Sequence, residues 1–414
     1  MRREAVACTV VFAITLLSHL TYQFLSERDY FFPDSFTYLT PALSMLHGLG
    51  FTTEDGPETL RTPGYPVFLL PFLATGAPQG SIIGANHLLD ALLAAAVYWL
   101  ARRNGARKFV AIAGALIIAF DPITIHYANK ILTETLSATL AFLVFVIVTH
   151  RRTLPWLIGA GLLCGALVLV RPVAILYFGV VMLWLAWDRV RPMVVTAFVI
   201  SALALPVGWA SRNAAKTGVF TISSIGAINL MSYRAAAALA MEDGGDFKTR
   251  LAARQKELDA VVAKRVIAAE GVESAQELSS AELSRYYSAV AKPILLHHPR
   301  GAALMTIRGF FVNMFEDDWD ALAEVVDDEL IPEDATRIAV HVWTWVVWIV
   351  TIAGLVMFWR RDRKQAALIA ATIFYFLFMA AGGEAEGRFR VPVVPLMALA
   401  AASATPARDS RILR

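Results

Sequence analysis

The sequence has few charged residues and almost no cysteine. Asp, Glu, Lys and Arg make up 17% of its 414 residues, whereas hydrophobic residues make up 57%, and the mean hydropathy is +0.57. A water-soluble core cannot cover that much apolar surface, so the composition excludes a soluble enzyme and predicts an integral membrane protein. The net charge of +3 is too small to indicate a nucleic-acid partner. Cys8 and Cys164 both lie in apolar segments, which favours packing over a disulfide.

Internal repeats and low-complexity linkers are also missing, and the apolar residues instead gather in ten segments. Most of these approach the ~20 residues that an α-helix needs to cross a bilayer. Arg2 and Arg3 before the first segment would suit a signal peptide, but no cleavage site of small residues follows, so we expect that helix to be retained. The predicted spans are 6–25, 81–101, 109–127, 131–149, 154–170, 173–187, 193–210, 340–358, 365–381 and 391–405.

These segments predict an all-α polytopic membrane protein with about ten transmembrane helices. Residues 1–210 would hold spans one to seven, with a first outer loop at 26–80 that contains interfacial helices. Residues 211–339 would form an extracytoplasmic helical segment, and residues 340–414 would hold spans eight to ten.

Lys and Arg indicate the orientation, because they gather on the cytoplasmic side of membrane proteins. With the N-terminus in the cytoplasm, the short cytoplasmic segments hold 17 of the 37 basic residues. The outer loops other than 211–339 then hold six. We therefore expect both termini inside and the stretch at 34–66 outside, in the cytoplasmic (inner) membrane if the chain is bacterial, as its short loops suggest.

The long segment before span eight combines three patterns. Residues 246–292 place apolar residues three and four positions apart, which predicts amphipathic helices. Residues 301–315 are too short for a confident span and suit a helix in the membrane interface. Ten acidic residues and no basic one fall in 316–334, which favours a solvated face, although such stretches also bind divalent cations.

Polar residues are concentrated near the predicted outer surface. A polar side chain near membrane depth costs free energy and needs a reason. Those in this chain come from separate parts of the sequence, yet all fall in outer loops or at the outer ends of spans, which indicates one shared site. The candidate residues are Asp34, Tyr38, Arg61, Tyr65, Lys130, Glu134, Arg171, Arg388 and Arg390.

These residue types suit a reaction on a lipid phosphate. A carboxylate at the membrane surface can deprotonate a hydroxyl or an amine. Arginines at headgroup depth can hold a phosphate through bidentate hydrogen bonds. Together they predict that an acceptor attacks the anomeric carbon of a sugar while the lipid phosphate leaves.

The sequence resembles the C-type polytopic glycosyltransferases, above all the protein O-mannosyltransferases and the lipid A aminoarabinose transferases. After the first span it has Asp34, then Tyr38, a glycine-rich turn and the motif Arg-x-Pro-Gly-Tyr-Pro at 61–66. Further matching motifs are DPITIHYANKILTETL at 121–136, LVRP at 169–172, SRNAAKTGVF at 211–220, HHPRG at 297–301 and GRFRVPVVP at 387–395.

The resemblance implies an inverting transfer from a polyprenyl-phosphate sugar donor to a glycan, lipid or protein acceptor. It places the catalytic acid of the first loop on Asp34 and a donor-phosphate ligand on Arg61. By residue type and position, we expect phosphate ligands also at Arg171, Arg388 and Arg390, and substrate contacts at Tyr38, Tyr65, Lys130 and Glu134.

One departure concerns the residue before Arg61. The aminoarabinose transferases have an acidic residue there, where this chain has Leu60. A second loop carboxylate would have to come from Glu54, Asp55 or Glu58. This departure leaves the acceptor and the need for a divalent metal open, and no cofactor is certain from the sequence.

Each candidate residue also has a purely structural interpretation. Asp34 could cap a helix that begins at DSFTYL, and Glu134 could pair with Lys130 one turn earlier. Arg61 could extend to lipid headgroups. The same anchoring role would suit Arg171, Arg388 and Arg390.

Two other functions would also use polar groups in a membrane. A transporter or flippase of a lipid-linked saccharide would place them near the bilayer midplane, on broken helices in two repeated halves. A scaffold for envelope assembly would not need Asp34. The grouping at one surface favours the glycosyltransferase.

Overall fold

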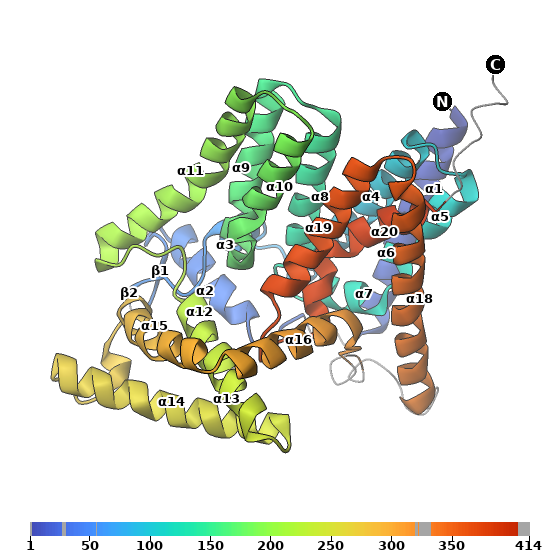
Figure 1. Ribbon diagram of the computed structural model, residues 1–414. Coiled ribbons are helices and arrows are strands. Elements are labelled where there is room, and N and C mark those ends of the chain that lie inside the picture. The colour runs from blue at the N-terminus through green and yellow to red at the C-terminus, as the bar shows by residue number, and fades with distance from the viewer. Residues whose placement is uncertain (1, 27–29, 55, 319–321, 323–332, 405–414) are drawn as a thin grey trace.

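The computed structural model describes residues 2–26, 30–54, 56–318, 322 and 333–404, and this part of the chain is mostly helical (Figure 1). All ten predicted apolar segments are helical over most of their length, so the all-α prediction is confirmed. One two-residue hairpin, formed by β1 (Thr52–Thr53) and β2 (Gly56–Pro57), lies in the first loop.

Among the described residues, four helices are long and apolar enough to cross a membrane: α1 (Arg2–Leu25), α4 (Gln79–Arg103), α11 (Pro192–Thr217) and α18 (Glu333–Trp359). A fifth crossing forms if α5 (Lys108–Ala115), α6 (Ile117–Phe120) and α7 (Pro122–Ala128) count as one bent span. The predicted number of ten spans is therefore not confirmed. The remaining apolar helices are shorter: α8 (Glu134–His150), α9 (Leu154–Val170), α10 (Tyr177–Trp187), α19 (Arg363–Met379) and α20 (Val394–Ala402).

The bend in the third predicted span, 109–127, has a local cause. α7 is turned by 50° from the helix before it. Asp121 adopts an extended conformation, as residues before proline prefer, and Pro122 is the first residue of α7. The Asp121 carboxylate then accepts the backbone N–H of Thr124, which caps α7.

Close helix contacts in the bundle depend on small residues. α9 and α11 approach so closely that a Cβ on Gly161 would meet the Phe198 carbonyl at 2.4 Å, and one on Gly165 the Ala202 carbonyl at 2.7 Å. Small residues allow such close packing between apolar helices, where dispersion contacts replace the hydrophobic effect.

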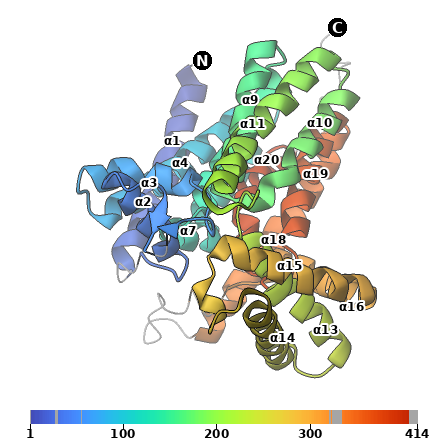
Figure 2. The same ribbon diagram turned by 90° about the vertical axis from the view of Figure 1, so that its left-hand side faces the viewer.

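A layer of helices crosses one end of this bundle (Figures 1 and 2). It contains α12 (Ile225–Ile228), η2 (Asn229–Ala235), α13 (Ala236–Asp243), α14 (Phe247–Glu270), η3 (Ala275–Glu277), α15 (Ser280–His297) and α16 (Pro299–Phe315). In α14 the buried residues Leu258, Val262 and Val266 are four apart and pack near Met231 and Val290. The helices predicted within 246–292 and at 301–315 are thus observed, and the interfacial position of α16 stays a prediction.

The acidic run at 316–334 begins with the exposed Glu316, but its second residue, Asp317, is buried and so departs from the solvated face predicted for the run. Asp317 is 1% exposed and lies 3.1 Å from His341 Nδ1 and 3.6 Å from Arg337 Nε. Two basic groups from α18 thus compensate the buried charge, as burial requires. Residues 319–321 and 323–332 of the run lie outside the described residues.

The first loop returns to the bundle at a glycine. α2 (Ser35–Leu46) and α3 (Gly64–Ala74) flank the hairpin. A Cβ on Gly64 would lie 2.5 Å from the Leu169 carbonyl, so only glycine lets α3 begin directly against the end of α9. This contact fixes the loop just after Arg61 and next to Arg171.

Candidate active site

Asp34, just before α2, is held by arginines from both ends of the chain. Its Oδ1 lies 2.6 Å from Arg61 Nη2, and its Oδ2 lies 3.2 Å from Arg388 Nη1. Arg388 belongs to the 3₁₀ helix η4 (Gly387–Val393), which precedes α20. Within the described residues, the carboxylate makes no capping bond to α2, so the structural interpretation as a helix cap is not observed. Its side chain is 30% exposed, which leaves the carboxylate accessible from one side.

Arg61 is fixed in place by α2 rather than extended to the surroundings. Its Nε donates to Thr37 Oγ1 at 2.8 Å, and its Nη1 donates to the Tyr38 hydroxyl at 3.2 Å. The guanidinium carbon lies 4.8 Å from the Tyr38 ring centroid, within cation–π range. Tyr65, fully buried at the start of α3, packs its ring edge-on against Tyr38 with 5.2 Å between centroids.

The backbone before Arg61 is anchored by a second arginine, Arg212. Arg212 Nη2 donates to the Phe51 carbonyl at 2.6 Å, and its Nη1 donates to the Glu58 carbonyl at 3.0 Å. The Glu58 carboxylate accepts the backbone N–H groups of Leu60 and Arg61. Sequence analysis did not single out Arg212, although a basic residue at the end of a span, inside a motif shared with the family, was a signal for it.

A second charged group adjoins the first through an aromatic ring. Arg388 Nε lies 2.7 Å from a Glu386 oxygen. Arg171 Nη1 lies 3.1 Å from Glu134 Oε1, so Glu134 pairs across the bundle. The guanidinium carbons of Arg171 and Arg388 each lie 5.1 Å from the Phe389 ring centroid. The predicted residues Asp34, Arg61, Arg171, Arg388, Glu134, Tyr38 and Tyr65 are therefore brought together.

Two further predicted residues, Arg390 and Lys130, are almost fully buried. Arg390, 2% exposed, donates to the Glu316 carbonyl at 2.6 Å and to Thr344 Oγ1 at 3.1 Å, which joins the end of α16 to α18. Lys130 is 5% exposed between α7 and α8, and its carbonyl accepts a bond from Asn86. Their predicted roles in phosphate and substrate binding stay predictions.

Burial and the surrounding arginines act on the carboxylates in opposite directions. Burial alone would raise the pKa of Asp34, but the charges and hydrogen bonds of Arg61 and Arg388 outweigh it and hold that pKa below its usual value. Burial raises the pKa of Glu386, and Arg388 offsets the rise only in part. Of these two carboxylates, Asp34 is thus the one whose pKa is lowered.

A metal site is not prearranged in the described part of the chain. No group of three or more His, Cys, Asp or Glu side chains there is placed to hold a metal ion. Of the three loop carboxylates that could have joined Asp34, Glu58 binds backbone amides and Glu54 is exposed, while Asp55 lies outside the described residues.

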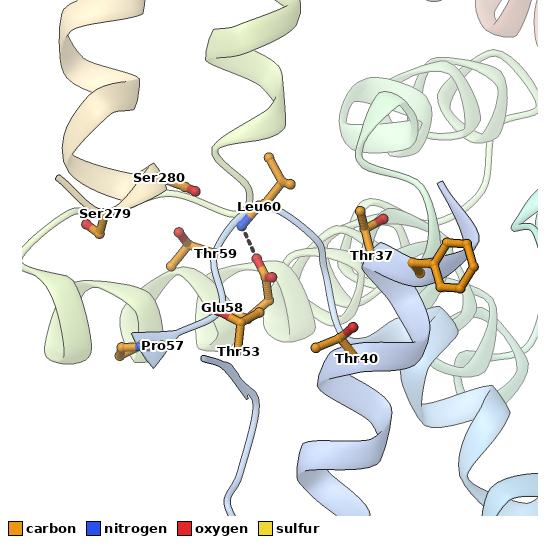
Figure 3. A pocket seen from close by; sticks show the side chains of 10 residues that line it. Thr37, Thr40, Thr53, Pro57, Glu58, Thr59, Leu60, Ser279 and Ser280 are labelled. Atoms are coloured by element: carbon orange, nitrogen blue, oxygen red, sulfur yellow. Dashed lines mark hydrogen bonds between the residues drawn. The ribbon is translucent and has the colours of Figure 1, made fainter. Parts of the chain in front are cut away.

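A cleft of about 310 Å³ opens beside Arg61 (Figure 3). One wall is the face of α2, a second is the strap from Pro57 to Leu60, and a third is the start of α15. Thr37 lines the cleft and also accepts the Arg61 hydrogen bond, so the cleft and the charged group share a side chain. The lining residues are Phe36, Thr37, Thr40, Thr53, Pro57, Glu58, Thr59, Leu60, Ser279 and Ser280.

Comparison with known proteins tests the family resemblance that the sequence motifs indicate. The model of the dolichyl-phosphate-mannose-protein mannosyltransferase family matches residues 71–222. The archaeal oligosaccharyltransferase AglB from Archaeoglobus fulgidus shares the fold, with a TM-score of 0.52 and 12% identity over 96% of this chain and 50% of that chain. The resemblance to the C-type polytopic glycosyltransferases is confirmed.

The chain spans half the length of AglB, and at 12% identity the likeness concerns the fold. ArnT from Cupriavidus metallidurans, in a structure bound to undecaprenyl phosphate, is 15% identical over 96% of this chain and 77% of that chain, with a TM-score of 0.42. No curated protein matches the sequence.

Proposed function

We propose that this protein is an inverting glycosyltransferase. It would move a sugar from a polyprenyl phosphate to an acceptor at the outer face of the cytoplasmic membrane. One observation carries the proposal: the partly exposed Asp34 carboxylate is held between Arg61 and Arg388. The fold adds support, because the AglB structure that shares it contains a dolichol-phosphate.

The reaction requires removal of a proton from the acceptor and stabilisation of the leaving phosphate, and different residues perform these two tasks. Asp34 takes the proton from the acceptor hydroxyl or amine as that atom bonds to the anomeric carbon. The bond between that carbon and the phosphate oxygen breaks, and its electron pair leaves with the polyprenyl phosphate. Arg61 and Arg388, which are already positioned by their contacts to Asp34, hold the phosphate and stabilise the charge that it gains.

The arrangement of Arg171 suits a supporting contact to the donor. Its guanidinium adjoins the ring that Arg388 also contacts, and Glu134 orients it. Tyr38 and Tyr65 form a rigid floor beneath Arg61. We assign Arg390 a structural role, since its donors bind a carbonyl and a threonine away from Asp34.

The donor can be tested by lipid analysis of the purified full chain. We expect mass spectrometry of protein in nanodiscs to find a polyprenyl phosphate or its sugar ester, enriched over empty nanodiscs. The double variant Arg61→Ala/Arg388→Ala should lose that lipid, whereas Arg254→Ala, which removes a partly exposed ion-pair arginine of α14, should keep it. Equal lipid content in protein and empty nanodiscs would exclude a tightly held donor.

One observation favours the second candidate, transport of a lipid-linked saccharide. His19 and His87 lie buried between α1 and α4 with 3.2 Å between their Nδ1 atoms, and Asp90 is 3.7 Å from His19. Ionisable groups within spans are typical of transport pathways. Transport predicts flipping of a lipid-linked sugar in proteoliposomes that Asp90→Asn abolishes and Asp34→Asn does not.

A further inference from the structure

The cleft beside Arg61 is lined by hydroxyl groups from three separate segments. Thr37 and Thr40 lie on α2, Thr59 lies on the strap between β2 and α3, and Ser279 and Ser280 begin α15 (Figure 3). The cleft thus forms only where the first loop meets the layer of outer helices. A ligand in it would contact both at once.

Most of these hydroxyls are unpaired among the residues that the structure describes. In the described part of the chain, the hydroxyls of Thr40, Thr53, Thr59 and Ser280 have no hydrogen-bond partner. Thr59 is 2% exposed, so its hydroxyl is buried except toward the cleft. These hydroxyls are thus free to bond to a ligand in the cleft.

The backbone that carries Thr59 is rigid. Its carbonyl accepts the backbone N–H of Ser224 at 2.8 Å, and the Leu60 carbonyl accepts the Ser223 hydroxyl. Two further bonds from Arg212 hold the preceding residues. The unpaired hydroxyl is therefore held in place for a ligand and cannot turn to bulk water by a loop movement.

The charge of the lining excludes an ionic ligand. Among the described lining residues there is no Lys or Arg, so a phosphate would find no counter-charge. The single carboxylate, Glu58, is already bound to the amides of Leu60 and Arg61. The donor phosphate therefore belongs with Arg61 and Arg388, on the other side of Thr37, and the cleft suits an uncharged molecule.

An exposed aromatic ring completes the lining. Phe36 is 59% exposed and stacks on Phe31, with 5.1 Å between ring centroids and planes 5° apart. The apolar C–H face of a sugar ring can lie on such an aromatic face while its hydroxyls bond to groups at the edge. Hydroxyls that both donate and accept match those of a sugar, whereas an extended peptide would need a free strand edge.

We propose that this cleft is the acceptor subsite and that it takes the uncharged end of a glycan. The proposal rests on the proposed function, since Asp34 would remove the proton from the glycan hydroxyl that attacks the donor sugar. Thr37 is one turn after Asp34 and touches Arg61, so a glycan seated on α2 presents its end hydroxyl to both. The acceptor and the donor thus meet at Asp34 from opposite sides.

Binding of neutral trisaccharides tests the subsite without any transfer. The probes are maltotriose, mannotriose and chitotriose with one fluorophore at the reducing end, and an uncharged hexapeptide rich in Ser and Thr with the same label. Anisotropy is measured on the full chain in nanodiscs. We expect at least one trisaccharide to bind and the peptide to bind more weakly.

Variants locate the binding. Thr40→Trp and Ser280→Trp fill the cleft from opposite walls and should each weaken trisaccharide binding at least tenfold, while donor lipid content stays unchanged. The matched control is Ser288→Trp, on α15 in a separate cleft, which should bind like wild type. With two wall variants, the test remains valid if one of them fails to fold.

Three results would overturn the inference: no trisaccharide binds, the peptide binds more tightly, or the wall variants bind like wild type. Failure of the proposed function looks different. In that case trisaccharides would bind in the cleft, but the protein would hold no polyprenyl phosphate. If sugar is transferred from a polyprenyl phosphate and no trisaccharide binds, only the subsite fails.

Discussion

At the scale of single residues, the chemistry depends on one carboxylate held by two guanidinium groups. The sequence predicts Asp34, Arg61 and Arg388, because polar side chains beside a membrane need a reason. It does not predict their pairing. Arg388 and Arg390 are two residues apart in one 3₁₀ helix, yet only Arg388 reaches Asp34. Helical spacing suggested Lys130 as the ion-pair partner of Glu134. The structure shows an ion pair between Glu134 and Arg171, which lies 37 residues further along the chain.

Arg61 provides a test of phosphate binding at this scale. Arg61→Ala should raise the KM for the donor and lower the transfer rate on the order of 10²-fold, as the loss of one preorganised donor does. Arg61→Lys should recover only part, because an ammonium cannot form the forked contact. Steady-state kinetics with varied donor would measure both. Donor kinetics unchanged in Arg61→Ala would remove Arg61 from the site.

The pH dependence of transfer should report the ionisation of Asp34. A base is active above its pKa, and the pKa of Asp34 is lowered, so the wild-type rate should fall only at pH below the usual range of a carboxylate. Arg388→Gln removes one of the charges that lower this pKa, and burial then raises it. The acid limb of kcat against pH should therefore move to higher pH in the variant. A limb that stays in place or moves down contradicts the assignment of Asp34 as the base.

At the scale of elements, the site is positioned by contacts that a single sequence does not reveal. Arg212 at the end of α11 holds the loop before Arg61, although 154 and 161 residues separate it from its partners Glu58 and Phe51. The strand hairpin and the 3₁₀ helix η4 were not predicted, because short irregular segments lack the periodicity that identifies long helices. Long amphipathic helices, such as α14, have this periodicity and were predicted.

The junction of α3 and α9 gives an element-scale prediction. Gly64→Ala would force these helices apart, since its Cβ would overlap the Leu169 backbone. We expect a loss of about 1–3 kcal/mol in stability, as overpacking costs, and a raised donor KM because Arg61 and Arg171 separate. Thermal unfolding in detergent and donor kinetics would measure these effects.

Gly179→Ala is the matched control, because a Cβ at Gly179 on α10 meets nothing within 4 Å. It should leave both the unfolding temperature and the donor KM unchanged. Equal behaviour of the two variants would show that the close contact at Gly64 does not hold the loop in place.

At the scale of the whole molecule, the helical class was predictable from composition, and the number of spans was not. Apolar segments of 17 residues or fewer form helices here without reaching the length of a full crossing. Pro122 breaks the predicted span 109–127 into shorter helices, and Pro172, between two predicted spans, begins a 3₁₀ helix that shortens the next one, which hydropathy alone does not show. The orientation therefore still rests on the distribution of Lys and Arg.

Cysteine labelling would test this orientation. In a background with Cys8→Ala and Cys164→Ala, cysteines at Glu54 and Glu270 should react with a membrane-impermeant maleimide in intact cells. A cysteine at Asp362, between α18 and α19, should react only after the cells are opened. Labelling of position 362 from outside would reverse the proposed orientation and move Asp34 to the other face.

The whole account depends most directly on Asp34→Asn. The variant keeps the shape of the side chain and removes its charge, while Arg61 retains Thr37 and Tyr38 as partners and Arg388 retains Glu386. It should therefore purify with wild-type yield and bound lipid donor. Asp246→Asn, at an exposed helix cap of α14, is the matched control and should transfer sugar normally.

The decisive measurement is the initial rate of sugar transfer from polyprenyl phosphate by folded, lipid-bound Asp34→Asn. The account predicts a rate lower by about 10²- to 10⁴-fold, the usual contribution of a general base. A rate within a few-fold of wild type, in protein with the same bound lipid, would contradict the claim that Asp34 is the base.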